Sequence, residues 1–193
     1  MKIIEILSEM TLKDKKVAIL LRHSERFLIK SNEFGNDVLL TPNGQKMSIE
    51  FGRLLKAYKI YKIFSSPIER CRQTADGICK GYNDSVKIVS TNVLGDPGVH
   101  IYDPEKLGEY YLEKGFQTIF SEYKKGIPVP GLHSPEIIKI KFDDYLNENT
   151  KTNQISLFIT HDWQIAFYAF AKKLKEYTED DWINYLEGLI LEF

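Results

Sequence analysis

Residues 17–26 read Val17-Ala18-Ile19-Leu20-Leu21-Arg22-His23-Ser24-Glu25-Arg26. The five apolar residues follow two lysines and precede an arginine, which predicts a short strand buried on both faces. Ligand sites in open α/β sheets gather beyond the carboxyl ends of such strands. A buried arginine is costly unless it faces an anion, and a guanidinium offers two parallel donors to phosphate oxygens. We therefore expect Arg22 to face a phosphate group, although this segment alone is also compatible with a solvated loop.

A second strand is predicted over 60–64, and Ser65-Ser66-Pro67 follows it. Ser66 is expected to cap a helix whose first residue is Pro67. The four-residue spacing of Arg70 and Thr74 places both on one helix face. Arg70 would then address the same anion as the helix N-terminus, although a charged, solvated helix face gives the same pattern.

A third apolar strand is predicted over 155–160, and it ends in His161-Asp162 before a helix that begins at Trp163. Asp162 is among the residue types that cap helices best, and His161 has a purely structural alternative as a hydrogen-bonded residue at a strand end. In a parallel sheet, however, the three strands would carry their polar ends to one edge. The spacing therefore predicts a single site built from all three.

These residues resemble the histidine phosphatase superfamily, which includes phosphoglycerate mutases, acid phosphatases and phytases. The resemblance covers 17–26, 41–55, 60–78 and 155–165, in the family's order. Residues 41–45, Thr-Pro-Asn-Gly-Gln, are similar to the family's Leu-Thr-x-x-Gly element. The most specific match is 65–75, where the serines, proline, arginine and threonine are all in register.

The resemblance implies that His23 attacks phosphorus and becomes a phosphohistidine, which water then hydrolyses. His23 must be neutral to attack, so we expect its remote ring nitrogen to donate a proton to a backbone carbonyl. Arg22, Arg70 and His161 would bind the three equatorial oxygens, and Arg26 would be a fourth donor. The implied fold is a three-layer α/β/α sandwich with a mostly parallel central sheet, phosphoglycerate mutase-like, with a small helical or loop insertion over the site.

The sequence departs from the mutase-like branch, which usually has glycine at position 24 and after the second histidine. Arg26 and Asp162 are instead similar to the acid phosphatase and phytase branch, although Leu28 stands where that branch has proline. We therefore expect Asp162 to be the general acid, in a hybrid site. The alternative general acid is Asp96, which lies where the mutase-like branch carries its acid, although Asp-Pro-Gly is also a turn sequence.

The function predicted from these features is hydrolysis of phosphomonoesters, without a metal or cofactor, on a small molecule or a phosphoprotein. A phosphohistidine protein phosphatase, a phosphomutase and a non-catalytic phosphoryl-binding module are the alternatives. An open site without a cap over His23 would favour the protein phosphatase. The physiological substrate is open, because residues 95–150 and the loop 27–40, which would set specificity, contain no motif with a known mechanism.

Composition agrees with one domain spanning 1–193, because 43% of the 193 residues are hydrophobic. The formal net charge of −1 gives no basic footprint for nucleic acid. Cys71 and Cys79 would lie about 12 Å apart on one helix, too far for a disulfide. Free thiols, together with the absence of a signal peptide or membrane span, predict a cytoplasmic protein that has no membrane partner. His100 and His133 have no partner at metal-ligand spacing, so no metal site is expected, and the oligomeric state is open.

Other elements follow from apolar periodicity. Helices are predicted over 3–10, 43–57 and 163–175, a strand over 86–93, and an edge or antiparallel strand after Gly188. Residues 95–150 are expected to form a cap of helices and loops over the site. Aromatic residues of this region could line a substrate mouth, but plain packing is the favoured interpretation; they are Tyr102, Tyr110, Tyr111, Phe116, Phe120 and Tyr123.

Overall fold

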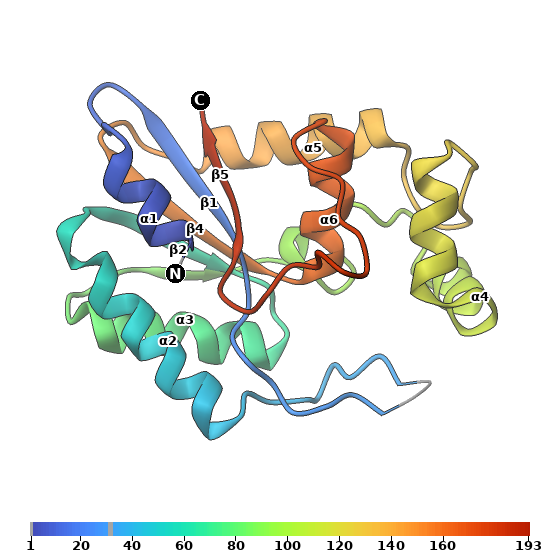
Figure 1. The fold of residues 1–193 in the computed structure, drawn as a ribbon, viewed down its shortest axis with the longest axis horizontal. Coiled ribbons are helices and arrows are strands. Elements are labelled where there is room, and N and C mark those ends of the chain that lie inside the picture. The colour runs from blue at the N-terminus through green and yellow to red at the C-terminus, as the bar shows by residue number, and fades with distance from the viewer. Residues whose placement is uncertain (1, 31–32) are drawn as a thin grey trace.

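The computed structural model describes residues 2–30 and 33–193. Its centre is a five-stranded sheet in the order β3-β2-β4-β1-β5 (Figure 1). The strands are β1 (Lys16–Arg22), β2 (Ile60–Ser65), β3 (Ile88–Ser90), β4 (Gln154–Thr160) and β5 (Gly188–Glu192). The first four strands pair in parallel, and β5 pairs antiparallel with β1 at the edge. The predicted mostly parallel sheet and the antiparallel last strand are both confirmed.

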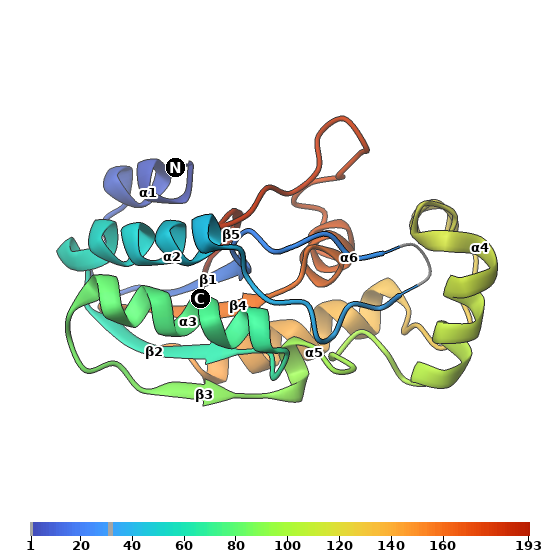
Figure 2. The same ribbon diagram turned by 90° about the horizontal axis from the view of Figure 1, so that it is seen from below.

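Helices cover both faces of the sheet (Figure 2). One face packs against α1 (Lys2–Glu9), α2 (Pro42–Leu54) and α3 (Glu69–Tyr82). The other face packs against α5 (Pro135–Glu148) and α6 (Asp162–Ala171), and α4 (Pro104–Lys124) lies beyond α6. Short 3-10 turns span Leu55–Ala57 and Asn92–Leu94. The predicted three-layer α/β/α arrangement is confirmed.

Strand β1 is buried on both faces, as its apolar run predicts. Ala18 and Leu20 pack in the core beneath α5 and α6. Val17, Ile19 and Leu21 alternate with them and pack beneath α2 and α3. Because successive side chains of a strand point to opposite faces, one short segment contributes to both cores.

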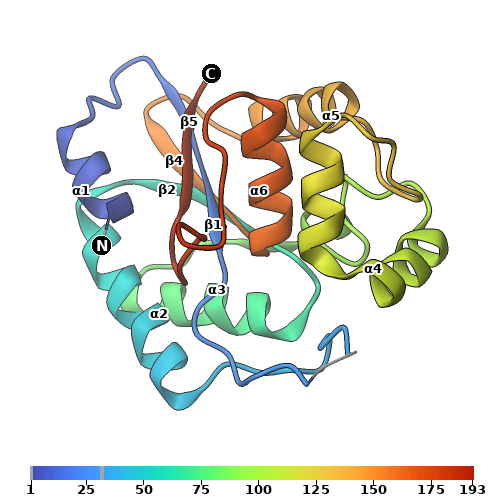
Figure 3. The same cartoon turned by 45° about the vertical axis from the view of Figure 1, so that its right-hand side comes forward.

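The three strands predicted to share a site are neighbours in the sheet and end at the same edge (Figure 3). Arg22, the last residue of β1, pairs with Thr160 of β4. Ser65, the last residue of β2, pairs with Ile159 of β4. The residues that follow each strand therefore emerge side by side.

Several predicted boundaries need correction. Helix α3 begins at Glu69 rather than Pro67, and its capping residue is Ile68 rather than Ser66. Ser66 lies just past β2, where its backbone N–H still donates to Ile159 at 2.9 Å. Its Oγ contacts His161 and accepts from the backbone N–H of Ile68, so the turn at 66–68 precedes the helix. Strand β3 is limited to Ile88–Ser90 because a 3-10 turn follows it.

The outer helices are also shorter than predicted. Helix α2 ends at Leu54, where the 3-10 turn Leu55–Ala57 begins. The side chain of Leu54 is 40% exposed, so it does not pack in the core. Helix α6 starts one residue earlier than predicted and ends at Ala171, because Lys173 has a φ of 56°. Both cysteines are free, as predicted, whereas the cytoplasmic location stays a prediction. Over 2–30 and 33–193, no helix is long and apolar enough to cross a membrane.

Candidate active site

His23 lies just beyond β1 and is only 2% exposed. Its Nδ1 lies 2.7 Å from the carbonyl oxygen of Ser24, and a carbonyl can only accept. Nδ1 therefore carries the proton, and Nε2 presents its lone pair. Burial, with the neighbouring His161 and Arg70, lowers the pKa of His23 well below its usual range. The ring is neutral and has the tautomer that the sequence predicts for a nucleophile.

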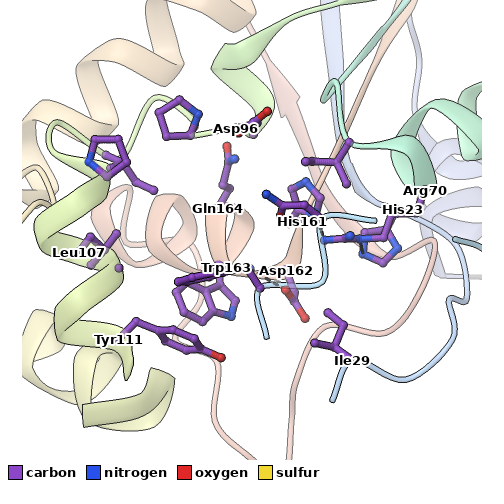
Figure 4. Close-up of a pocket in the computed structure, with 18 of the residues that line it drawn as sticks. His23, Ile29, Arg70, Asp96, Leu107, Tyr111, His161, Asp162, Trp163 and Gln164 are labelled. Carbon is purple, nitrogen blue, oxygen red and sulfur yellow. Dashed lines mark hydrogen bonds between the residues drawn. The ribbon is translucent and has the colours of Figure 1, made fainter. Parts of the chain in front are cut away.

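Arg70 reaches the site from the first turn of α3 and lies between two imidazoles (Figure 4). Its Nε donates to His23 Nε2 at 3.1 Å, and its Nη2 lies 3.2 Å from His161 Nδ1. Its Nη1 donates to the carbonyl of Gly35 at 2.5 Å. One guanidinium thus aligns both histidines and anchors part of the loop between β1 and α2.

His161 caps α6 at the end of β4, and its ring centroid lies 5.4 Å from that of His23. Since Nδ1 accepts from Arg70, Nε2 carries the proton and faces Ser66 Oγ at 3.1 Å. Burial, with the charge of Arg70, lowers the pKa of His161 well below its usual range. Gly95 lies against this pair, where a Cβ would be 2.5 Å from Ser66 Oγ and 2.9 Å from His161 Nε2.

Arg22 is held by Asp162 and by two residues that the sequence analysis did not identify, Ile183 and Tyr185. Its Nη2 forms an ion pair with Asp162 at 2.8 Å, and its Nη1 donates to the carbonyl of Ile183. Its guanidinium carbon lies 4.4 Å from the ring centroid of Tyr185. The buried Nε has no hydrogen-bond partner among the described residues, so one donor remains for an anion.

Asp162 is the first residue of α6, and both of its oxygens accept hydrogen bonds. Oδ1 accepts from the backbone of Trp163 at 3.0 Å. Oδ2 accepts from Trp182 Nε1 at 3.1 Å and pairs with Arg22. A proton on Oδ2 would displace one of these donors, so the geometry suits a carboxylate that positions Arg22.

Asp96 and Arg26 lie at the rim of the same site. Asp96 is exposed, and the structure gives its carboxylate no hydrogen bond to another described residue. Its φ of 61° is in the left-handed region, which aspartate and asparagine tolerate better than most residues. Arg26 is half-buried, and its Nη1 donates to the carbonyl of Phe27 at 2.8 Å.

The loop after His23 is held by residues of the Leu-Thr-x-x-Gly and Arg-x-x-x-Thr elements. Ser24 donates its side-chain proton to the carbonyl of Gly44 at 2.7 Å and its backbone N–H to Thr74 Oγ1 at 3.0 Å. A Cβ on Gly44 would lie 1.9 Å from the carbonyl oxygen of Glu25. Position 44 must therefore be glycine for α2 to approach this loop, and Thr41 caps the helix through the Gly44 N–H.

All seven predicted site residues line one cavity of about 610 Å³: Arg22, His23, Arg26, Arg70, Asp96, His161 and Asp162. The cavity extends toward α4, where Leu107 and Tyr111 line it, with Trp163 of α6 nearby (Figure 4). Of the six aromatic residues in the predicted cap, only Tyr111 lines the cavity, and Phe116, Phe120 and Tyr123 pack in the core or against it.

Gln164 and His100 also line the cavity, and sequence reasoning assigned them no role. The signal available was the position of Gln164 three residues after His161, on the same side of a helix. In the ranges 2–30 and 33–193, no group of three or more His, Cys, Asp or Glu side chains could hold a metal ion. Ser31 and Asn32 of the loop 27–40 lie outside the described residues.

A sequence model of the histidine phosphatase superfamily (branch 1) matches residues 18–94, which carry β1, α2, β2 and α3. Over these residues, which make up less than half of the chain, the sequence is similar to the histidine phosphatase superfamily. The match contains His23, Arg22, Arg26 and Arg70 and stops before Asp96. No curated protein matches the sequence.

Two solved structures have a similar fold. A phosphoglycerate mutase from Bacillus anthracis str. Sterne is 16% identical with a TM-score of 0.63, covering 94% of this chain and 89% of its own. A mycobacterial glucosyl-3-phosphoglycerate phosphatase is 11% identical with a TM-score of 0.62, covering 92% and 90%. The phosphoglycerate mutase-like fold is confirmed, while the role of each site residue stays a prediction.

Proposed function

We propose that this protein hydrolyses phosphomonoesters through a phosphohistidine on His23, without a metal ion. The observation that carries the proposal is the His23 tautomer, because a proton on Nδ1 leaves the Nε2 lone pair facing Arg70 and His161. A neutral imidazole is the nucleophilic form, and its low pKa keeps it neutral near pH 7.

In the first step, His23 Nε2 attacks phosphorus, an N–P bond forms and the bond to the ester oxygen breaks. Arg22, Arg70 and His161 stabilise the charge on the equatorial oxygens, which is the main catalytic contribution in phosphoryl transfer. The leaving oxygen takes a proton from a carboxylic acid. In the second step, water attacks phosphorus, an O–P bond forms and the N–P bond breaks. The carboxylate takes a proton from the water, and phosphate and neutral His23 are released.

Asp96 is our proposed proton donor, and Asp162 becomes the alternative. The exposed carboxylate of Asp96 lies next to Gly95, which itself lies against His161. Asp162, in contrast, is engaged by Arg22, Trp163 and Trp182. A group that must lose and regain a proton in each cycle is better served by a carboxylate that no cation holds.

A small-molecule substrate is supported over a phosphoprotein by the depth of the site. His23 is 2% exposed, and α4 and the loop after β1 both contribute to the cavity wall. A protein phosphohistidine would have to enter between them. A phosphomutase or a phosphoryl-binding module would use the same cavity, and an assay separates each of them from a hydrolase.

The test is hydrolysis of p-nitrophenyl phosphate between pH 4 and 8 in the presence of EDTA, by wild type and His23→Ala. We expect activity that survives EDTA in the wild type and is lost in the variant, together with an acid-labile phosphoryl label that only the wild type acquires. Added alcohol acceptors reveal a phosphotransferase if they become phosphorylated. No hydrolysis and no label in the wild type would refute the proposal in favour of a binding module.

A further inference from the structure

The cavity continues past the phosphate-binding residues into a compartment with different chemistry. Gln164 is the third residue of α6, and its side chain rises toward the loop that carries Asp96 (Figure 4). His100 lines the same cavity from the segment that follows this loop. Ile101 and Leu107 add apolar walls.

Two polar atoms in this compartment have no hydrogen-bond partner among the described residues. They are Oε1 of Gln164, which is 2% exposed, and Nδ1 of His100, which is 3% exposed. A buried polar atom that lacks a hydrogen bond costs free energy. Such atoms are therefore uncommon in folded proteins, and each one calls for an explanation. Both belong to side chains that line the cavity, so a ligand there would lie against these two residues.

The backbone is shaped to bring Gln164 there. Gly98 has a φ of +97° and would place a Cβ 2.4 Å from Gln164 Nε2 and 2.9 Å from His100 Cε1. Position 98 must therefore lack a side chain for the amide to lie against this loop. Together with Gly95, it lets one short loop contact both the phosphate end and the amide end of the cavity.

Gln164 and His100, the two polar side chains that define the compartment, are uncharged. Burial, together with the nearby His133, lowers the pKa of His100 to about 3, so its ring is neutral near pH 7. Gln164 carries no charge. By contrast, three arginines contribute positive charge at the phosphate end. A second phosphate or carboxylate on the substrate would find no cation among these compartment residues, whereas a hydroxyl group can donate to Gln164 Oε1 and accept from its amide.

The two ends of the cavity are close. His161 caps α6 and Gln164 is the third residue of that helix, a separation of three positions at which Cβ atoms along a helix are about 5–6 Å apart. A hydroxyl group a few bonds from the ester oxygen spans that distance. We propose that Gln164 and His100 form a leaving-group subsite that selects esters of neutral, hydroxylated molecules such as sugars and polyols. This inference rests on the proposed function.

The test compares kcat/KM for hydroxylated esters with that for hydrocarbon esters of the same skeleton. Glycerol 3-phosphate is paired with propyl phosphate, and glucose 6-phosphate with cyclohexylmethyl phosphate; ribose 5-phosphate extends the panel. We expect at least one hydroxylated ester to exceed its hydrocarbon partner roughly tenfold or more, because the hydrocarbon leaves the buried acceptor unpaired. Equal kcat/KM within every pair, or a phosphohistidine peptide preferred over all of them, would overturn the subsite.

Variants locate the effect. Gln164→Met keeps the length of the side chain but removes its polar atoms, and should collapse the ratio within the preferred pair toward one. Gln117→Met, on the exposed side of α4, is the matched control and should leave the ratio unchanged. A preserved ratio in a folded Gln164→Met variant would refute the assignment.

Calorimetric binding of the same pairs to His23→Ala gives the second readout, since that variant cannot turn them over. If His23→Ala binds the hydroxylated esters preferentially and the wild type hydrolyses none of them, the subsite is supported and the phosphatase activity is refuted. If the wild type hydrolyses the esters and neither kcat/KM nor binding shows a preference, the phosphatase activity is supported and the subsite is refuted.

Discussion

Exchanging each candidate acid for asparagine separates a proton donor from a positioning residue. Asn keeps the shape of Asp but cannot donate an acidic proton, and it tolerates the left-handed backbone at position 96. General acid catalysis typically contributes 10²–10⁴-fold. We therefore expect Asp96→Asn to lower kcat/KM for an alkyl phosphate about 100-fold or more. For p-nitrophenyl phosphate the loss should be below about tenfold, because nitrophenolate leaves without a proton.

Asp162→Asn should behave differently, since its carboxylate neutralises Arg22. Their side chains are 20% and 11% exposed, so the variant leaves a nearly buried cation short of its partner. Breaking such a pair costs about 2–3 kcal/mol, below the full range for buried pairs because Arg22 keeps Ile183 and Tyr185. At about 2–4 °C per kcal/mol for a chain of this size, Tm should fall by roughly 4–12 °C.

Asp96→Asn should change stability by no more than about 0.5 kcal/mol, because the carboxylate is exposed. The assay is kcat/KM for a series of esters with leaving groups of increasing basicity, with thermal unfolding of the same samples. We use kcat/KM because it reports only the steps up to the first irreversible one. The later hydrolysis of the phosphohistidine therefore does not affect the comparison. A steep dependence on the leaving group in Asp162→Asn, with a flat one in Asp96→Asn, would refute the reasoning and restore Asp162 as the acid.

Three further predictions concern pH, backbone space and phosphate binding. The folded pKa of His100 is depressed to about 3, so its contribution to stability is complete above its unfolded pKa of about 6.5 and is lost as pH falls toward 3. The free energy of unfolding in urea should therefore decrease as pH is lowered from about 6.5 toward 3. His100→Asn should reduce the slope over this range by about 1.4 kcal/mol per pH unit; an unchanged slope contradicts this. Gly95→Ala should lower kcat at least about 100-fold by displacing the adjacent serine and histidine, whereas Gly126→Ala, also at positive φ but in open space, should cost stability only; equal kinetics contradict the steric argument. Arg70→Ala should abolish binding of inorganic phosphate in calorimetry, and Arg26→Ala should weaken it by less than about tenfold; the reverse order would contradict the geometry.

The parts that sequence predicted well are those in which one local pattern determines one local outcome. An apolar run of five predicted β1, and the polar residue after each strand predicted the shared edge, because parallel neighbours must end together. The tautomer of His23 was predictable too, because a neutral nucleophilic imidazole needs its other nitrogen occupied.

What was missed depends on contacts between distant segments. Trp182, Ile183 and Tyr185 hold Asp162 and Arg22, yet the segment that carries them has no motif and no periodicity. The start of α3 was misplaced because Ser-Ser-Pro is locally an ideal helix start. Tertiary hydrogen bonds from β4 and His161 overrule that preference.

The contacts of Asp162 and Arg22 also bear on how the phosphate end of the cavity is placed relative to the proposed leaving-group subsite at Gln164. His161 caps α6, and Asp162 and Gln164 are the first and third residues of that helix, so one short segment supplies side chains to both ends of the cavity. The ion pair between Asp162 and Arg22 links the start of this helix to the end of β1, and Arg22 Nε has no partner among the described residues. We therefore expect a phosphoryl group bound at that Nε to be positioned by the same ion pair that joins α6, and with it Gln164, to β1. We therefore expect loss of the Arg22–Asp162 pair to change the preference among leaving groups as well as the affinity for phosphate.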